Sequence, residues 1–287
     1  MKYAWIEEHR DEFSVSRMCR LFDVSRTGYC QSRKRRPSKR AVANAGLDAK
    51  IAAIHEVSKR SYGRPRIVRS LHESGMTVSH ERVRHSLIRQ GLRPVYKRPY
   101  RVTTDSNHLK PVAANVLDRR FDGWRLNRAW VGDITYVETG EGWLYLACVM
   151  DLASRRIVGW SMSDRIKTEL VNQALKSAYW LRKPAAGLIM HTDRGTQYAS
   201  ANHRKLIHDY QMVQSMSRRA NCWDNAAMES FFKTLKVECL HRHRYETRAQ
   251  AKLDIVDWIE GFYNRQRLHS SIGYMTPVDV ESNVMTA

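Results

Sequence analysis

The fold of this chain is decided by residues 130–162, which read WVGDITYVETGEGWLYLACVMDLASRRIVGWSM. Residues 130–137 are typical of a strand, and the apolar run at 143–151 has the length of a buried strand. A Gly-Glu-Gly turn at 140–142 separates the two, and residues 156–162 predict a third strand. The stretch therefore predicts three consecutive strands joined by short connections.

Helical and extended segments follow this stretch. Residues 167–182 repeat apolar side chains at helical spacing, and residues 187–192 predict a short fourth strand. Further helices are expected from residue 224 and over 248–263. This order predicts an α/β domain with a mixed sheet. Three tryptophans are expected in its core: Trp143, Trp160 and Trp180.

The chain of 287 residues has a formal net charge of +20 that is unevenly distributed. Residues 1–120 hold 27 Lys and Arg against 11 Asp and Glu, a net charge of +16, and residues 121–287 carry only +4. Such a surplus predicts a polyanionic partner for the first part of the chain. No apolar run approaches the roughly 18 residues of a spanning helix, so nucleic acid is favoured over a membrane.

The cysteines favour a reducing compartment. No two of them form a CxxC pair, and their wide spacing argues against a disulfide framework and against a zinc site local in sequence. The first residues also lack the apolar core of a signal peptide. The expected location is the cytoplasm. The five cysteines are Cys19, Cys30, Cys148, Cys222 and Cys239.

The first basic segment has the pattern of a helix-turn-helix. A short helix at 16–22 is followed by a turn, and Ser25 is a good N-cap for a second helix rich in Arg and Tyr. Arg26 would lie near the start of this recognition helix and contact DNA. The run 33–40, which Pro37 interrupts, is interpreted as a linker that contacts phosphates.

A second helix-turn-helix candidate follows. A helix is expected over 47–58, and Arg64 and Arg66 open the next one, which Gly75 ends. Ser79 can cap a third helix, which carries Arg82 on its polar side. Two such units in series within the basic half predict DNA binding, with these three arginines as contacts.

Three acids stand where a purely structural chain would not place them. Asp133 lies inside the first apolar strand, and a carboxylate there is costly unless it is paired or binds a metal. Asp193 comes directly after the fourth strand, and Glu229 lies on the helix that begins near 224. Lys233 and Lys236 share the helix stripe of Glu229 and are expected to hold DNA phosphates.

Converging carboxylates suit hard divalent cations. Two Mg²⁺ ions, with Mn²⁺ as a substitute, could activate a water or a 3′-hydroxyl for in-line phosphoryl transfer. Other acids and neighbours have competing interpretations. Asp151 is a rival ligand or a strand-end turn former, and Asp224 is a helix N-terminal acid or a catalytic one. His191 is a hydrogen-bonded strand-end residue or one that positions water or DNA, and Trp223 is a base-stacking or a structural side chain.

These motifs resemble a known family. The strand Asp, the Asp of HTDRGTQY and a Glu after 35 intervening residues form the acidic pattern of DDE transposases and retroviral integrases. The stretches DNAAMESFFKTLK and YNRQRLHSSIGYMTP are similar to the B-frame transposases of a large bacterial insertion-sequence family. The resemblance implies an RNase-H-like core with a mixed five-stranded sheet, Asp133, Asp193 and Glu229 as metal ligands, and Lys236 as a DNA contact.

The resemblance also implies an activity and partners. Such enzymes nick DNA at the terminal inverted repeat and transfer the freed 3′-hydroxyl to target DNA, acting at least as a dimer on DNA. The patch 264–269 would lie near DNA or be a solvated helix end. A DNA-binding regulator that needs an upstream A-frame partner and an RNase-H-like nuclease remain alternatives, and the His-His-Cys-Cys zinc module of integrases is absent. The expected domains are two helix-turn-helix-like regions, a linker, the catalytic core and a helical extension, at 1–45, 46–95, 96–124, 125–240 and 241–287.

Overall fold

A computed structural model of the chain describes residues 1–34, 36–95, 111–219 and 221–286. It confirms the mixed sheet, whose five strands lie in the order β3-β2-β1-β4-β5. The first three strands are antiparallel neighbours, while β4 and β5 run parallel to β1. The strands are β1 (Ala129–Thr139), β2 (Gly142–Asp151), β3 (Ile157–Ser163), β4 (Ile189–Thr192) and β5 (Val213–Met216).

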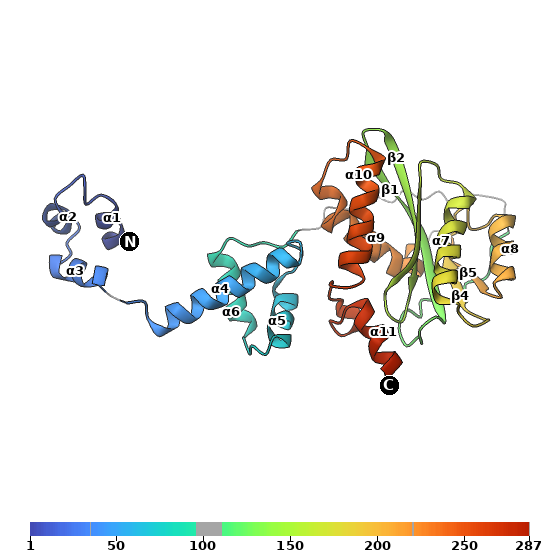
Figure 1. Cartoon of the computed structure of the whole chain (residues 1–287), viewed down its shortest axis with the longest axis horizontal. Helices are drawn as coiled ribbons and strands as arrows, with labels where there is room; N and C mark the ends of the chain where they lie inside the picture. Colours follow the sequence, from blue (N-terminus) through green and yellow to red (C-terminus); the bar gives the residue numbers. More distant parts are fainter. Residues whose placement is uncertain (35, 96–110, 220, 287) are drawn as a thin grey trace.

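Helices cover both faces of this sheet (Figure 1). Because side chains alternate between the faces of a strand, Trp130 and Val131 enter two different cores. Trp130 packs with α7 and α8, and Val131 packs with α9, α10 and the π-helical stretch η3. These elements are α7 (Thr168–Arg182), α8 (Ala201–Asp209), α9 (Ala226–Glu238), α10 (Arg248–Val256) and η3 (Asp257–Tyr263).

Gly159 explains how closely α7 approaches the sheet. A Cβ atom on this residue of β3 would collide with the carbonyl oxygen of Ala174 and lie 2.6 Å from the amide nitrogen of Ala178. Both obstacles are helix backbone, which cannot move aside as a flexible side chain can. Glycine is therefore required where β3 passes beneath α7.

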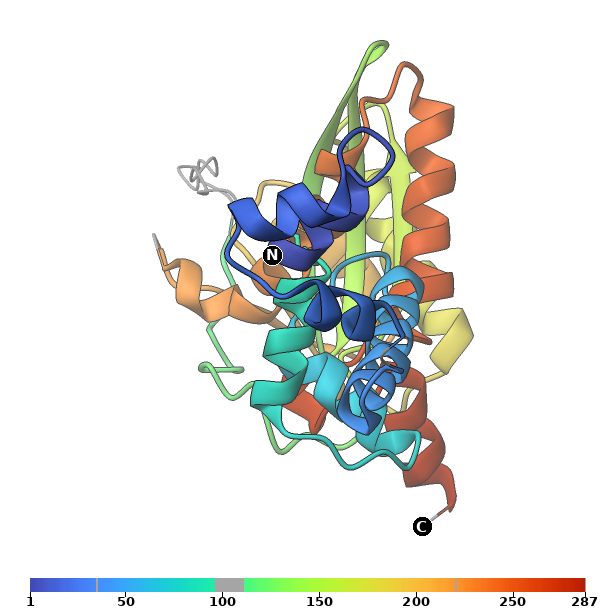
Figure 2. The same ribbon diagram turned by 90° about the vertical axis from the view of Figure 1, so that its left-hand side faces the viewer.

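The basic half consists of two groups of helices. The first group stands apart from the rest in Figure 1 and is drawn in front of it in Figure 2. It has its own small core, formed by Ile6, Met18, Cys19 and Tyr29. Ser25 caps α3 as expected, since its Oγ accepts a hydrogen bond from the Gly28 amide at 2.9 Å. The helices are α1 (Lys2–Glu8), α2 (Val15–Leu21), α3 (Arg26–Lys34), α4 (Lys39–Val57), α5 (Arg64–Glu73) and α6 (His80–Arg89).

Helix α4 begins earlier than the sequence predicted. The expected helix was 47–58, but α4 starts at Lys39, where the Ser38 side chain caps it by accepting from the Ala41 amide. The alanine-rich start of the helix has high helix propensity, so nothing delays it once Ser38 has capped the first turn. The boundary expected between 45 and 46 therefore falls inside one helix. Residues 96–110 of the expected linker lie outside the described residues.

Helices α4, α5 and α6 share one continuous core with the sheet domain. Ile51 and Ile67 belong to the same buried cluster as Val131 of β1 and Trp258 of η3. The C-terminal helix α11 (Pro277–Thr286) is fastened to the sheet domain by the buried Glu281, which accepts hydrogen bonds from a group of side chains: Ser154, Arg156 and Arg182.

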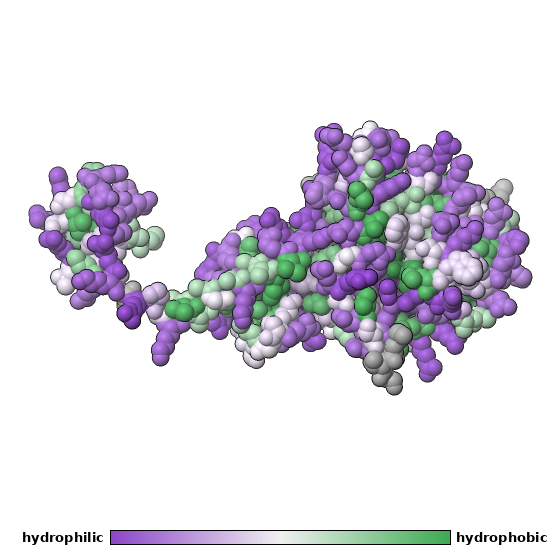
Figure 3. All heavy atoms as spheres, in the orientation of Figure 1, coloured by the Kyte–Doolittle hydropathy of each residue, from purple (hydrophilic) through white to green (hydrophobic). Residues whose placement is uncertain are grey.

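Two of the expected core tryptophans are at the surface. Trp143 is 47% exposed and Trp180 is 65% exposed, whereas Trp160 is partly buried and packs on the core. Trp143 is the second residue of β2, at the end of the strand that reaches solvent, and Trp180 lies on the outer side of α7. Hydrophilic residues cover most of the face seen in Figure 3. In the described part of the chain, no helix is long and apolar enough to cross a membrane.

Candidate active site

The register of two parallel strands brings Asp133 and Asp193 together. Gly132 of β1 and Thr192 of β4 are the last residues paired in this ladder. Strand β4 ends there, while β1 continues to Thr139. Asp133 and Asp193 are the next residues of their strands, so both leave the ladder at the same level. This edge is where ligands bind in sheets that contain parallel strands.

Local hydrogen bonds orient both aspartates. Asp133 Oδ1 accepts from the Ile134 amide at 2.7 Å, and Asp193 Oδ1 accepts from the Gly195 amide at 2.9 Å. Each of these bonds uses only one carboxylate oxygen. A carboxylate has two oxygens with about four acceptor sites between them, so it can accept more than one bond.

Helix α9 carries the third acid to the same place. The Asn225 side chain, just before α9, donates from Nδ2 to the Gly132 carbonyl at 3.2 Å. This bond anchors the start of α9 beside Asp133, and Glu229 lies in the first turn of the helix. The expected buried stripe is confirmed, since Met228, Phe232, Leu235 and Cys239 are each less than 8% exposed.

The three acids affect each other electrostatically. Burial raises the pKa of Asp133 well above its usual range, and the negative charges of Asp193 and Glu229 raise it further. Partial burial raises the pKa of Glu229, whose side chain reaches solvent, and the positive charge of Lys233 lowers it. The charges of Asp193 and Glu229 therefore act on the Asp133 carboxylate.

The chemistry of this set fits a hard divalent cation. Mg²⁺ takes carboxylate oxygens, and a cation would relieve the repulsion that raises the pKa of Asp133. Within the described residues, no group of three or more His, Cys, Asp or Glu side chains is already gathered as a metal site. Asp133, Asp193 and Glu229 are the candidate ligands, because the charges of the last two act on the Asp133 carboxylate.

The neighbouring acids have structural partners. Asp151, at the end of β2, is fully buried and accepts from the Asn127 and Ala153 amides and the Trp130 indole. This supports its interpretation as a strand-end turn former. Asp224 is also fully buried and pairs with Arg218 and Arg119 at 2.7 and 2.8 Å. These guanidinium groups hold the pKa of Asp224 far below its usual range and tie the loop before α9 to the segment at 115–119.

His191 and Trp223 differ in exposure, since His191 is buried and Trp223 is exposed. The buried His191 ring shares hydrogen bonds with the hydroxyls of Ser215 and Ser217 at 2.8 and 3.2 Å, so it is a hydrogen-bonded strand-end histidine. Burial lowers its pKa to about 4, which keeps the ring neutral. Trp223 is 69% exposed on the loop before α9. Its role in stacking on a base stays a prediction.

Two lysines of α9 lie along the same side as Glu229. Lys233 is exposed, one turn after Glu229. Lys236 lies over the ring of Tyr136, with its Nζ 4.7 Å from the ring centroid, and its charge lowers the pKa of Asp133. Tyr136 in turn packs edge-on against the exposed Trp143. An aromatic pair and two ammonium groups therefore flank the acids.

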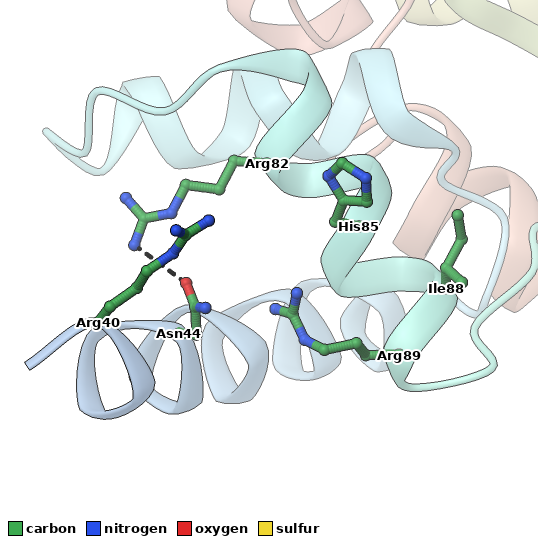
Figure 4. A pocket seen from close by; sticks show the side chains of 6 residues that line it. All are labelled: Arg40, Asn44, Arg82, His85, Ile88 and Arg89. Atoms are coloured by element: carbon green, nitrogen blue, oxygen red, sulfur yellow. Dashed lines mark hydrogen bonds between the residues drawn. The ribbon is translucent and has the colours of Figure 1, made fainter. Parts of the chain in front are cut away.

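A basic pocket opens between α4 and α6. Its volume is about 680 Å³, and Figure 4 shows three arginine side chains and a histidine around it. Arg82 donates weakly to the Asn44 side chain at 3.5 Å, and Arg89 pairs with Asp48 at 2.6 Å. The sequence indicated Arg82 as a DNA contact and placed Arg40 in a phosphate-contacting linker, whereas Arg40 lies in α4, which begins at Lys39. The lining residues are Arg40, Asn44, Arg82, His85, Ile88 and Arg89.

The other arginines expected to contact DNA differ in exposure. Arg26 begins α3 and Arg64 begins α5, and both are exposed. Arg66 is partly buried, donates from Nε to the carbonyl of Leu268 at 2.9 Å and lies against the ring of Tyr62. Its guanidinium therefore contacts the sheet domain.

Comparison with known proteins agrees with this arrangement. The model of the integrase core domain matches residues 125–222, a second integrase core model matches 210–277, and an HTH-like domain model matches 42–100. The chain is 41% identical over 285 residues to the transposase InsF for insertion sequence IS3A of Escherichia coli (strain K12), covering 98% of this chain and 99% of that relative. The chain belongs to the IS3-family transposases.

Other relatives of this transposase extend the comparison. The insertion element IS600 uncharacterized 31 kDa protein of Shigella sonnei is 42% identical over 260 residues, which cover 91% of this chain and 96% of that protein. Among solved structures, the HTLV-2 integrase catalytic core domain in complex with magnesium is 16% identical, covers 55% of this chain and 99% of its own, and has a TM-score of 0.43. The expected family and RNase-H-like integrase-core fold are confirmed.

Proposed function

We propose that this transposase nicks DNA at the ends of its insertion sequence and joins the freed 3′ ends to target DNA. The observation that carries the proposal is the emergence of Asp133 and Asp193 from adjacent parallel strands, with Glu229 in the first turn of α9, whose start Asn225 ties to Gly132. Three such carboxylates are the ligands that two Mg²⁺ ions use in phosphoryl transfer. Mn²⁺ would substitute, because it takes the same oxygen ligands.

The residues of the chain divide this work. Asp133, Asp193 and Glu229 hold the ions, which supply an activated oxygen nucleophile and stabilise the leaving oxygen. Lys233 and Lys236 hold the phosphates next to the acids. The exposed position of Lys233 and the placement of Lys236 beside Tyr136 support this role.

The basic half would bind the terminal inverted repeats. The exposed Arg26 and Arg64, together with Arg82 in the basic pocket, are the proposed DNA contacts there. Arg66 is better suited to joining the domains, because its Nε already donates to Leu268. Two element ends must be held at once, so the proposed assembly on DNA is at least a dimer, with an upstream A-frame protein as a further partner in the bacterial cytoplasm.

The decisive experiment compares two first-turn glutamates. Glu229 lies in the first turn of α9, and Glu169 lies in the first turn of α7 on the other face of the sheet. With Mg²⁺ and a duplex that carries the element's terminal repeat, wild type and Glu169→Gln are expected to nick the repeat end. Glu229→Gln is expected to lose about 100-fold in rate while it still binds the duplex.

The outcomes separate the proposed function from its alternatives. Equal nicking by wild type and Glu229→Gln would remove Glu229 from the catalytic set. Binding of the repeat without nicking by either protein would favour a DNA-binding regulator. Nicking without any strand-transfer product on target DNA would favour a nuclease.

A further inference from the structure

The segment Asn264–His269 (NRQRLH) was expected either near DNA or as a solvated helix end. Arg265 and Gln266 are exposed, but the other four residues are buried. Asn264 is 1% exposed, Arg267 5%, Leu268 7% and His269 8%. The segment follows η3 and runs between the sheet domain and the helices α4 and α5. A polar segment this deeply buried must find its hydrogen-bond partners inside the protein.

Its first contact is with the sheet. The side chain of Asn264 accepts from the Ile157 amide at 3.0 Å and donates to the Ile157 carbonyl at 3.1 Å. This amide therefore pairs with the start of β3 much as a neighbouring strand would. The beginning of the segment is fixed to the sheet.

Its second contact is with α9, the helix of Glu229. Arg267 donates to both carboxylate oxygens of Glu238, at 2.7 and 2.8 Å, and neither side chain is more than 10% exposed. A two-pronged arginine–carboxylate pair fixes orientation as well as distance. Glu238 is the last residue of α9, so the pair fixes the far end of the helix that Asn225 anchors at its start.

Its third contact is with the DNA-reading helices. The hydroxyl of Tyr62, between α4 and α5, donates to the Gln266 carbonyl at 3.0 Å and accepts from the Leu268 amide at 2.8 Å. Arg66 of α5 donates to the Leu268 carbonyl at 2.9 Å. Nearby, Lys59 pairs with Asp257 of η3 at 2.5 Å.

We propose that this segment is a strut that fixes the distance between the repeat-reading helices and the catalytic carboxylates, and so determines which phosphodiester is cut. Asn264 holds the sheet, Arg267 holds α9, and Leu268 holds Tyr62 and Arg66. The strut residues are positioning residues, since none of them lies among the acids. This inference rests on the proposed function, because it assumes that the helices read DNA while the acids cut it.

The test loosens the strut without touching either site. Tyr62→Phe removes both hydroxyl hydrogen bonds and keeps the ring, and Arg66→Met removes the bond to Leu268. Arg60→Ala is the matched control, since Arg60 belongs to the same connection but pairs with the exposed Glu56 of α4. Each full-length protein is incubated with Mg²⁺ and an end-labelled duplex that carries the terminal repeat, and the nick is mapped to the nucleotide.

Wild type and Arg60→Ala are expected to nick at one position. Tyr62→Phe and Arg66→Met are expected to bind the repeat within about twofold of wild type but to spread their nicks over several neighbouring positions, since a looser joint allows several phosphodiesters to reach the acids. A single nick at the wild-type position in both variants would overturn the strut. A purely structural role would lower the rate and leave the position unchanged.

A tether covers the case in which Tyr62→Phe gives too little product to map. Lys59→Cys and Asp257→Cys, added to Tyr62→Phe, place two thiols where the ion pair now joins the same two parts. A short bis-methanethiosulfonate cross-linker, which replaces the length of the lysine side chain, should restore nicking at one position, and dithiothreitol should reverse the effect. Failure of the cross-linked protein to restore it would also overturn the strut.

A second readout does not need cleavage. Hydroxyl-radical footprinting of wild type on the repeat should give two protected stretches, one from α4–α6 and one from the sheet domain, at a fixed spacing. Tyr62→Phe should keep the first stretch and lose protection in the second. Absence of nicking by wild type would contradict the proposed function. Protection of both stretches, unchanged in Tyr62→Phe, would contradict the strut, whether or not wild type nicks.

Discussion

Asp133 and Asp193 leave neighbouring parallel strands at the same level, because Gly132 and Thr192 are the last residue pair of the β1–β4 ladder. The two carboxylates therefore follow the last paired residues of the ladder, at the edge where the pairing of β1 with β4 ends. The sheet thus supplies two of the proposed metal ligands, and α9 supplies the third. The accuracy of the site therefore depends on how α9 is fastened to β1.

The fastening is the Asn225 side chain, and it gives the first prediction. Asn225→Ala removes the bond from Nδ2 to the Gly132 carbonyl, which leaves a buried acceptor without its partner. We expect a loss of about 1–3 kcal/mol in the free energy of unfolding. We also expect nicking to fall by more than the folded fraction does, because Glu229 loses its fixed position. Urea unfolding and nicking rates measure the two effects, and unchanged nicking would show that α9 needs no such anchor.

Lys236 gives the second prediction. If Lys236 holds a DNA phosphate, Lys236→Ala should weaken binding and reduce the slope of log affinity against log salt by about 1. Lys205→Ala is the control, because Lys205 lies on α8, across the sheet, and pairs with Asp209. Fluorescence anisotropy between 50 and 200 mM salt measures both slopes. Equal slopes for the two variants would mean that Lys236 does not contact phosphate.

The basic pocket gives the third prediction. Arg40 and Arg82 converge there from α4 and α6, and like charges gathered in one place favour an anionic occupant such as a DNA phosphate. Arg40→Ala should reduce the affinity for the repeat and lower the salt slope by about 1. Arg69→Ala, which removes an exposed cation paired with Glu73 on α5, should change neither. A normal slope for Arg40→Ala would exclude the pocket from the DNA interface.

The sequence predicted the local features of this protein well. The first strands, the caps at Ser25 and Ser79, and the apolar stripe of α9 all follow from side chains that are close together along the chain. Asp133 and Asp193 could be selected individually, because a carboxylate in or just after an apolar strand is costly unless it is paired or binds a metal. Their alignment could not be predicted, since it depends on the register of two strands 60 residues apart in number.

Long-range packing accounts for the remaining differences. The basic letters of NRQRLH indicate a solvent or DNA contact, yet Arg267 is buried by its pairing with Glu238, 29 residues away. Arg66 was expected to contact DNA, and its Nε donates to the Leu268 carbonyl. A positive side chain shows that an anion or a carbonyl is needed, but only the fold decides which one it meets.

Gly159 gives a fourth prediction, on stability. Gly159→Ala would place a Cβ against the backbone of α7, 2.6 Å from the Ala178 amide nitrogen. Because neither β3 nor α7 can shift without disturbing the core, we expect a loss of about 1–3 kcal/mol, the usual effect of overpacking. Gly75→Ala is not a clean control, since Gly75 has a φ of +79°. Gly46→Ala is suitable, because a Cβ there meets nothing within 4 Å. Thermal unfolding of both variants tests the expectation.

His203 gives the last prediction, on pH. Its ring is buried, its Nδ1 pairs with the Asn172 side chain at 2.7 Å, and burial lowers its pKa to about 4. In the unfolded chain a histidine titrates near 6.5, so below that pH the unfolded state takes up a proton that the folded state refuses. The stability from this residue is therefore present above pH 6.5 and is lost as pH falls towards 4, by about 2 kcal/mol at pH 5. Urea unfolding at pH 7.5 and pH 5.0 should show His203→Gln losing about 2 kcal/mol less than wild type over this interval. An equal loss in both proteins would mean that His203 is already protonated in the folded state.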